Sequence, residues 1–388
     1  MIALVIACLA LLVALIALGF AVVAWHRLTP AGQLRPGGGA RAQAGQSSAG
    51  AAAEVPGPAT TAAAPYLIYN PVKVERTAEL EELAARRAAD GGLGRPVWVA
   101  TTQAEPGTSQ ARAAVAAGAS VVVALGGDGT VRAVAAGLAG SDVPLGIVPC
   151  GTGNLLARNL EVPLDGLADQ FTTAFTGQDR AMDMAWLAAD MVDSADVPPT
   201  PAPAGLDFAF TGGQVHGFTV LAGVGFDAAM IEGVDSHLKG KLGWGAYVVS
   251  GVKNSFSSRF HARLALGTGG SERLAARTIF AANCGKLQGG VTLVKDAQLD
   301  DGWLDLVALD TRRGILGVVA LGRQLLRHRW GRSNGEQGTA ASSTFRRTRA
   351  ADIRLEEPVM AQVDGEYIGL VRAVSIRIQP GALTVRVP

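Results

Sequence analysis

The chain has 388 residues, of which 49% are hydrophobic and 17% are charged. Its 34 Lys and Arg residues nearly balance its 33 Asp and Glu residues, which argues against nucleic-acid binding and against an acidic disordered protein. The three cysteines, Cys8, Cys150 and Cys284, are far apart, so we expect neither a disulfide framework nor a cysteine metal site. This composition indicates a globular protein that works in a reducing compartment.

Residues 1–27 predict a transmembrane anchor. Residues 2–25 carry no charged side chain, and a helix of this length would cross a hydrocarbon core of about 30 Å. A cleaved signal peptide is the alternative, although the apolar stretch is long for one and no basic residue precedes it. Arg27, Arg35 and Arg41 all follow the segment, so the positive-inside rule places the remaining chain in the cytoplasm. We expect a single-pass protein of the cell membrane.

Three further regions follow the anchor. Residues 28–64 are rich in Ala, Gly, Pro and Ser and predict a flexible linker. Residues 65–184 alternate strands with helices, which predicts an α/β domain with a parallel sheet. Over residues 185–388 the apolar residues recur with period two, which predicts an antiparallel β-sandwich domain whose final strand can return to the first domain.

In chain order, the elements predicted for the first domain are strand 66–69, helix 77–89, strand 97–100, helix 109–117, strand 121–125, helix 131–138, strand 145–148 and a short helix at 155–158. The Pro-rich stretch 193–205 predicts an exposed loop. The strands predicted for the second domain are 218–221, 262–266, 304–309 and 374–378.

Two glycine-rich loops follow neighbouring predicted strands. The first, Gly126–Thr130, has the sequence GGDGT and leads into a helix, so backbone N–H groups and the positive end of the helix dipole meet there. The second, Gly151–Asn154, has the sequence GTGN. Neither loop is a Walker A or dinucleotide motif. Two such loops at the carboxyl ends of parallel strands predict one crevice for an anion, most simply a nucleotide phosphate.

GGDGT followed by GTGN resembles the diacylglycerol kinase catalytic domain, a family that includes soluble-type bacterial diacylglycerol kinases and sphingosine kinases. The likeness covers most of residues 65–388. It implies transfer of the ATP γ-phosphate to a lipid hydroxyl, with diacylglycerol, a sphingoid base, a polyprenol or another lipid alcohol all open as acceptors. The residues implied to contact the nucleotide are Asn70, Pro71, Thr102, Gly126, Gly127, Asp128, Gly129, Thr130, Gly151, Thr152 and Asn154.

The resemblance also implies a Mg²⁺ ion at the acidic turn 296–305. Asp301 would supply its side chain, and Gln298 and Trp303 their backbone carbonyls, since hard cations prefer oxygen ligands. Asp183 would join a magnesium–water network with Asp128. From the residues alone, a solvated Asp-Gly hairpin explains this turn equally well.

The second acidic cluster, Gln362–Glu366, places two carboxylates around a glycine. A like-charged neighbour raises the pKa of a carboxyl group, which suits a general base. The resemblance assigns the proton acceptor to Glu366, with Asp364 as the alternative. Without the resemblance, this segment is typical of an ordinary hairpin tip.

The chain departs from the family pattern at three places. Leu155 stands where many relatives have Asp, Arg132 where Asn is common, and Val72-Lys73 where Ser-Gly is frequent. Two alternatives therefore stay open: an NAD kinase-like enzyme, and a membrane-tethered nucleotide-binding module without turnover. The expected partners are a lipid alcohol and the membrane. We expect no nucleic-acid partner, and a homodimer stays open as an alternative.

Residues 312–349 contain nine Arg and one acidic residue. Within this segment, residues 315–330 predict a helix with a basic face, which either packs against a domain or contacts anionic headgroups as a second membrane contact.

Overall fold

The computed structural model describes residues 63–192, 202–208, 213–225, 259–267, 269–286, 294, 297–311 and 341–388. The predicted anchor, nearly all of the predicted linker and most of the basic segment 312–349 lie outside these residues. Within them, no helix is both long and apolar enough to span a membrane.

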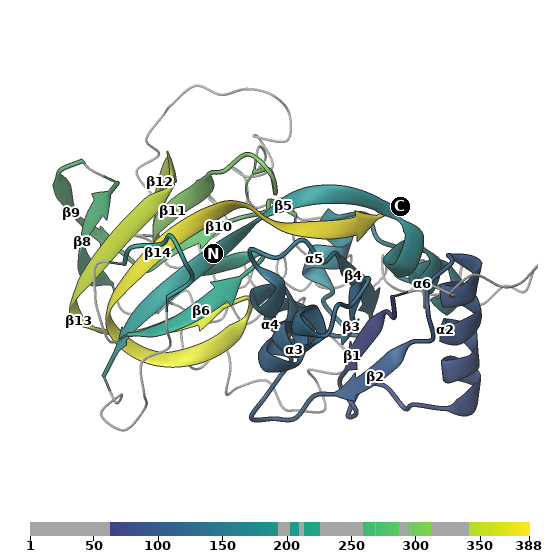
Figure 1. Cartoon of the computed structure of the whole chain (residues 1–388). Coiled ribbons are helices and arrows are strands. Elements are labelled where there is room, and N and C mark those ends of the chain that lie inside the picture. The colour runs from purple at the N-terminus through teal and green to yellow at the C-terminus, as the bar shows by residue number, and fades with distance from the viewer. Residues whose placement is uncertain are drawn as a thin grey trace, which may run out of the picture. The chain divides into compact units, whose positions relative to one another are not determined.

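The first part of the described chain is a parallel sheet with helices (Figure 1). Its strands lie in the order β4-β3-β1-β2 and are parallel. They are β1 (Tyr66–Tyr69), β2 (Val97–Ala100), β3 (Val122–Gly126) and β4 (Leu145–Pro149). The helices are α2 (Ala78–Asp90), α3 (Thr108–Ala116), α4 (Asp128–Leu138), α5 (Leu155–Asn159) and α6 (Leu167–Thr176). The α/β prediction is confirmed.

Both faces of this sheet are covered, which explains the uninterrupted apolar sequence of its central strands. Val123 and Leu125 of β3 pack with buried residues of α2 and α6 on one face. Val122 and Ala124 pack with α3, α4 and α5 on the other. All residues of β3 and β4 are buried, so the residues that follow these two strands are held on a rigid support.

The second part of the described chain is rich in antiparallel strands, as predicted. These are β5 (Gln178–Met191), β6 (Gln214–Phe218), β7 (Leu221–Val224), β8 (Phe260–Leu266), β9 (Ser271–Ala276), β10 (Thr278–Ala282), β11 (Leu304–Thr311), β12 (Ala341–Thr348), β13 (Ala350–Val363) and β14 (Glu366–Val387). Alternate residues of these strands form a separate apolar core. The predicted boundary after residue 184 falls inside β5, and where the two parts divide stays a prediction.

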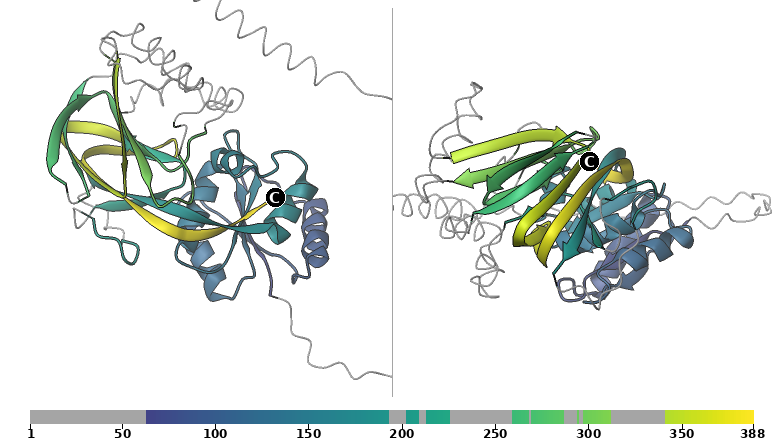
Figure 2. Two further views of the ribbon diagram at one scale, coloured as in Figure 1. Left: turned by 90° about the horizontal axis from the view of Figure 1, so that it is seen from above. Right: turned by 90° about the vertical axis from the view of Figure 1, so that its left-hand side faces the viewer.

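The long strand β14 connects the two parts. It pairs antiparallel with β13 and β5, and Val385 near its end pairs parallel with Leu145 of β4. Figure 2 shows the yellow C-terminal strand extending from the β-rich part to the α/β part. The fourteen strands in the described part of the chain belong to one hydrogen-bonded sheet.

The predicted strand 218–221 is wrong in one respect. Instead of one strand there are two, because β6 ends at Phe218 and β7 begins at Leu221. The backbone N–H groups of residues 219–221 donate to the buried carboxylate of Asp364 rather than to a neighbouring strand. This side chain thus breaks the ladder that the apolar sequence favours.

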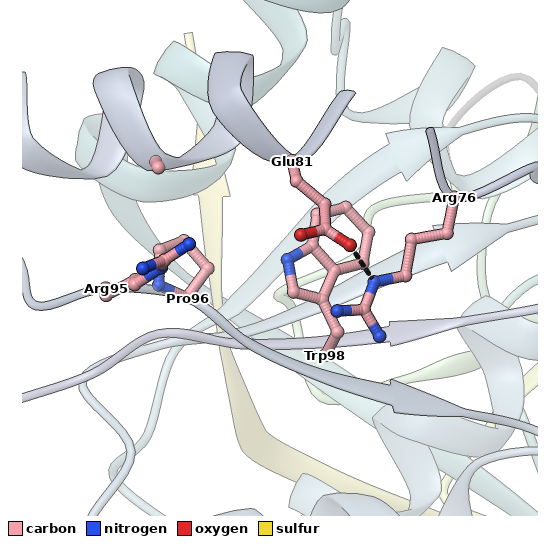
Figure 3. Close-up of a pocket in the computed structure, with 6 residues that line it drawn as sticks. Arg76, Glu81, Arg95, Pro96 and Trp98 are labelled. Carbon is pink, nitrogen blue, oxygen red and sulfur yellow. Dashed lines mark hydrogen bonds and ion pairs between the residues drawn. The ribbon is translucent and has the colours of Figure 1, made fainter. Parts of the chain in front are cut away.

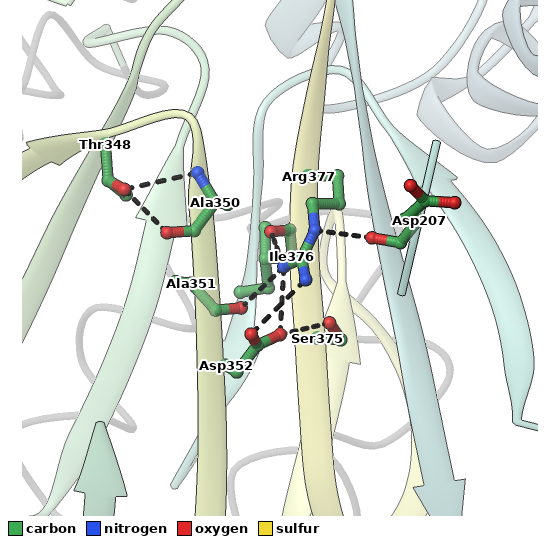
Figure 4. Close-up of polar contacts among 8 residues, drawn as sticks. All are labelled: Asp207, Thr348, Ala350, Ala351, Asp352, Ser375, Ile376 and Arg377. Atoms are coloured by element: carbon green, nitrogen blue, oxygen red, sulfur yellow. Dashed lines mark hydrogen bonds and ion pairs between the residues drawn. The ribbon is translucent and has the colours of Figure 1, made fainter. Parts of the chain in front are cut away.

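A second polar cluster ties the segment 202–208 to β14 (Figure 4). The guanidinium of Arg377 donates to the backbone oxygen of Asp207 at 2.8 Å and forms an ion pair with Asp352 at 2.9 Å. The same guanidinium lies 5.8 Å from the ring centre of Phe208. One arginine therefore fixes the residues that follow the predicted Pro-rich loop.

Candidate nucleotide and catalytic site

The two glycine-rich loops touch each other. They follow β3 and β4, which are adjacent, and the N–H of Cys150 donates to the carbonyl of Gly126 at 2.8 Å. A β-carbon placed on Gly151 would lie 2.7 Å from Cα of Gly127, so neither backbone leaves room for a side chain there. The structure thus brings together the residues that the sequence placed in one crevice.

Helix α4 begins earlier than the sequence predicted, at Asp128 instead of Val131. Gly129 and Thr130 therefore belong to its first turn. Its N-cap, Gly127, offers no side-chain hydrogen bond. Its first N–H groups are consequently suited to an anion.

Asp128 links the two loops. Its carboxylate oxygens accept hydrogen bonds from the backbone N–H groups of Asn154 at 2.9 Å and Leu155 at 2.6 Å. Burial raises the pKa of Asp128, and these two N–H groups oppose the rise. Leu155 supplies its N–H to this contact while its side chain is buried in the core. Asn154 has a φ of 48°. Its side-chain amide accepts from the N–H of Gly151 through Oδ1 and donates to the carbonyl of Gly151 through Nδ2.

The other candidate nucleotide contacts follow β1 and β2. Asn70 Oδ1 accepts from the N–H of Val72 at 2.9 Å, which closes the turn that contains Pro71. Thr102 Oγ1 accepts from the N–H of Glu105 at 3.0 Å. The predicted contacts thus follow the carboxyl ends of all four parallel strands, at the edge where open α/β sheets bind ligands.

Lys73 belongs to the site although we did not predict it. A β-carbon placed on Gly127 would lie 2.5 Å from Nζ of Lys73, so the ammonium group lies against the first glycine-rich loop. Its positive charge lowers the pKa values of Asp128 and Cys150 against the effect of burial. The signal in the sequence was the lysine that interrupts the Asn-Pro turn, a departure from the family pattern.

The turn between β13 and β14 carries both candidate bases. The carboxylate of Asp364 is buried and engaged by backbone donors, and burial raises its pKa. The side chain of Glu366 is 58% exposed and forms an ion pair with Arg132 of α4. A β-carbon placed on Gly129 would lie 2.5 Å from Oε1 of Glu366. Glu366 therefore reaches the first turn of α4. The buried Asp364 instead holds the turn between β13 and β14 in place.

Asp183 joins the acidic turn to β14. Its carboxylate oxygens accept from the N–H groups of Gly302 at 2.6 Å and Gly381 at 2.8 Å. Burial raises its pKa, and the nearby Asp301 and Asp300 carboxylates add to the rise. In these contacts Asp183 shapes the turn that was predicted to hold the metal.

The acidic turn could hold a hard cation, at the cost of an ion pair. Asp301 accepts from the N–H of Trp303 at 2.9 Å and pairs with Arg347, so a cation bound by Asp301 would take the place of this arginine. Within the described residues, no three His, Cys, Asp or Glu side chains form a metal-binding group. Such an ion would therefore depend on Asp301, on carbonyl oxygens such as those of Gln298 and Trp303, and on water.

A surface pocket of about 230 Å³ lies apart from these residues, between α2 and β2 (Figure 3). Arg76 lies 5.5 Å from the ring centre of Trp98 and pairs with Glu81 inside it. None of the predicted site residues lines this pocket.

Comparison with known proteins shows which protein family the chain resembles. Residues 65–187 match the diacylglycerol kinase catalytic domain, and residues 220–387 match the YegS C-terminal NAD kinase beta sandwich-like domain. A protein of Pseudomonas aeruginosa named probable lipid kinase YegS-like is 30% identical over 329 residues, which cover 79% of this chain and 90% of that protein. The chain belongs to this lipid kinase family.

A further relative and a solved structure are also similar to this chain. The diacylglycerol kinase of Bacillus subtilis is 26% identical over 277 residues, which cover 70% of this chain and 79% of that protein. A crystal structure of a diacylglycerol kinase from Bacillus anthracis, 19% identical, has a TM-score of 0.60 and covers 85% of this chain and 98% of that one. At this identity the structure supports the fold alone. The resemblance read from GGDGT and GTGN is confirmed as a family relationship.

Proposed function

We propose that the protein transfers the γ-phosphate of ATP to the hydroxyl group of a lipid, most simply diacylglycerol or a related lipid alcohol, giving phosphatidic acid or its analogue. The observation that carries the proposal is the contact between Glu366 and the first turn of α4. It places a partly exposed carboxylate at the helix end that is suited to phosphate.

The residues divide the reaction between them. The backbone of the two glycine-rich loops, the first turn of α4 and Lys73 bind the triphosphate. Glu366 accepts the proton of the lipid hydroxyl group. The hydroxyl oxygen of the lipid attacks the γ-phosphorus of ATP, and ADP leaves. Mg²⁺ would be held at the turn of Asp301, and when bound it neutralises charge on the phosphates. Asp128 and Asp183 hold the loops and the acidic turn in place.

Two observations favour a lipid kinase over the alternatives. The relatives that cover most of this chain are named lipid kinase or diacylglycerol kinase. A nucleotide-binding module without turnover would not need a carboxylate at the phosphate-binding helix, whereas a kinase does. We further propose that residues 1–27 anchor the enzyme in the bilayer that contains its substrate, with the kinase domain in the cytoplasm.

The test is phosphorylation of defined lipid alcohols by the purified full-length chain with labelled ATP and Mg²⁺, followed by mass spectrometry of the products. Diacylglycerol, a sphingoid base, a polyprenol and NAD are offered separately. A labelled phospholipid that disappears with Glu366→Gln supports the proposal. Labelled NADP as the only product, or no product from any of the lipid alcohols, would overturn it.

A further inference from the structure

Arg132 of α4 follows the GGDGT sequence by two positions and contacts Glu366. Its side chain is 14% exposed, and Nη2 donates to Oε2 of Glu366. Its Nε is buried and has no hydrogen-bond partner among the described residues. Buried polar groups of this kind are nearly always hydrogen bonded, so the unpaired Nε calls for an acceptor.

The Nε and Nη2 groups lie on one edge of the planar guanidinium. This edge presents two parallel N–H donors, which suit two oxygens of one phosphate group. Glu366 occupies only one of the two donors. A phosphate at the same place could take both, with a greater negative charge than a carboxylate has.

Glu366 already lies where such a phosphate would bind. Its Oε1 is 2.5 Å from the position that a β-carbon on Gly129 would take, in the first turn of α4. The N-terminal end of a helix attracts anions through its free N–H groups and its dipole. The carboxylate of Glu366 and a terminal phosphate would therefore compete for Arg132 and for this helix end.

We propose that Arg132 binds the terminal phosphate of the nucleotide and gives up Glu366 in exchange. The inference rests on the proposed kinase function and deepens it. With ADP, Arg132 keeps Glu366. With ATP, the γ-phosphate takes both donors of Arg132, and the released carboxylate turns to the lipid hydroxyl. The proton acceptor thus becomes available when the group to be transferred is in place.

The test measures direct binding of ADP and of a non-hydrolysable ATP analogue, with Mg²⁺, to the full-length protein. We expect Arg132→Met to weaken binding of the analogue at least about tenfold, the value of a charge-assisted contact, and ADP binding far less. Glu366→Gln removes the competing charge, so it should bind the analogue about threefold more tightly or better, although it loses turnover. The matched control, Arg86→Met, removes an exposed arginine of α2 and should change neither affinity.

An unchanged ratio of analogue to ADP affinity in Arg132→Met, or weaker analogue binding by Glu366→Gln, would overturn the inference and leave the proposed function intact. If the wild-type protein binds neither nucleotide, the proposed function fails as well. Thermal melting shows whether Arg132→Met folds. If it does not, Arg132→Lys takes its place, because lysine keeps the charge but lacks the two-donor edge. Arg132→Lys should lose part of the preference for the analogue, and full retention would count against the inference.

Discussion

The carboxylate of Asp364 accepts hydrogen bonds from both the backbone N–H and the hydroxyl group of Thr219, at 2.9 and 3.1 Å. It also accepts from the N–H groups of Val220 and Leu221, each at 2.9 Å. One buried side chain therefore joins the turn that carries Glu366 to the break between β6 and β7. With four donors on its two oxygens, Asp364 is placed to hold this turn rather than to take a proton.

Asp364→Ala should lower the free energy of unfolding by about 3 kcal/mol or more, because it leaves several buried N–H groups without an acceptor. Urea denaturation of the purified protein measures the change. Asp165→Ala removes an exposed carboxylate and is the control. An unfolding free energy equal to that of the wild type would contradict the supporting role of Asp364.

Asp128→Ala and Glu366→Gln should each leave a folded protein with turnover lower by at least about a hundredfold. The first breaks the link between the two glycine-rich loops, and the second removes the proton acceptor. The kcat of each variant with saturating ATP and lipid checks the expectation. Near-wild-type phosphorylation by Glu366→Gln would refute its assignment as the base and make Asp364 the next residue to test.

Lys73→Met should raise the KM for ATP about tenfold and change the KM for the lipid little, because the ammonium group lies against Gly127 in the first glycine-rich loop. Steady-state kinetics with each substrate varied in turn separates the two constants. Lys286→Met, which removes a lysine paired with Glu161, is the matched control. Equal KM values for ATP in wild type and Lys73→Met would exclude Lys73 from the phosphate site.

His216 should make stability depend on pH. Burial, followed by the positive charge of Arg132, lowers the pKa of His216 to about 4 from its usual 6.5. Between these values the unfolded chain binds a proton that the folded chain does not. The free energy of unfolding therefore falls as the pH decreases through this window, by up to about 3 kcal/mol for this group.

Urea denaturation at about pH 7 and about pH 5 tests this effect in the wild type and in His216→Asn. Since carboxylates also titrate at acid pH, the difference between the two proteins is the relevant quantity. We expect the variant to lose less stability on acidification. Equal losses would show that His216 does not carry this pH dependence.

The glycine-rich loops were predictable from the sequence because local rules determine them. The strand before Gly126 is apolar on both faces, which predicts a buried parallel strand, and loops after adjacent parallel strands must share one edge of the sheet. The GGDGT motif also carries its own chemistry. For these reasons the sequence places Asp128, Gly151 and Asn154 together without a structure.

The contacts that complete the site could not be predicted in this way. Arg132 and Glu366 are 234 positions apart, and no local pattern reports that they pair. The break at Thr219 was missed because its apolar neighbours favour a strand, while the carboxylate that interrupts it comes 145 positions later. The side chain of Lys73 reaches Gly127 through tertiary structure alone.

The pairing of strand β14 affects the order in which the protein folds during synthesis. The last residues of β14, through Val387, pair with the beginning of β5, and Val385 lies beside Leu145 of β4. During synthesis, the edge of β4 thus stays unpaired until Val385 has been made. Because contacts between residues this far apart form slowly, the α/β part is completed late and exposes an unpaired strand edge meanwhile. A truncation before Val385 would leave that edge of β4 permanently unpaired.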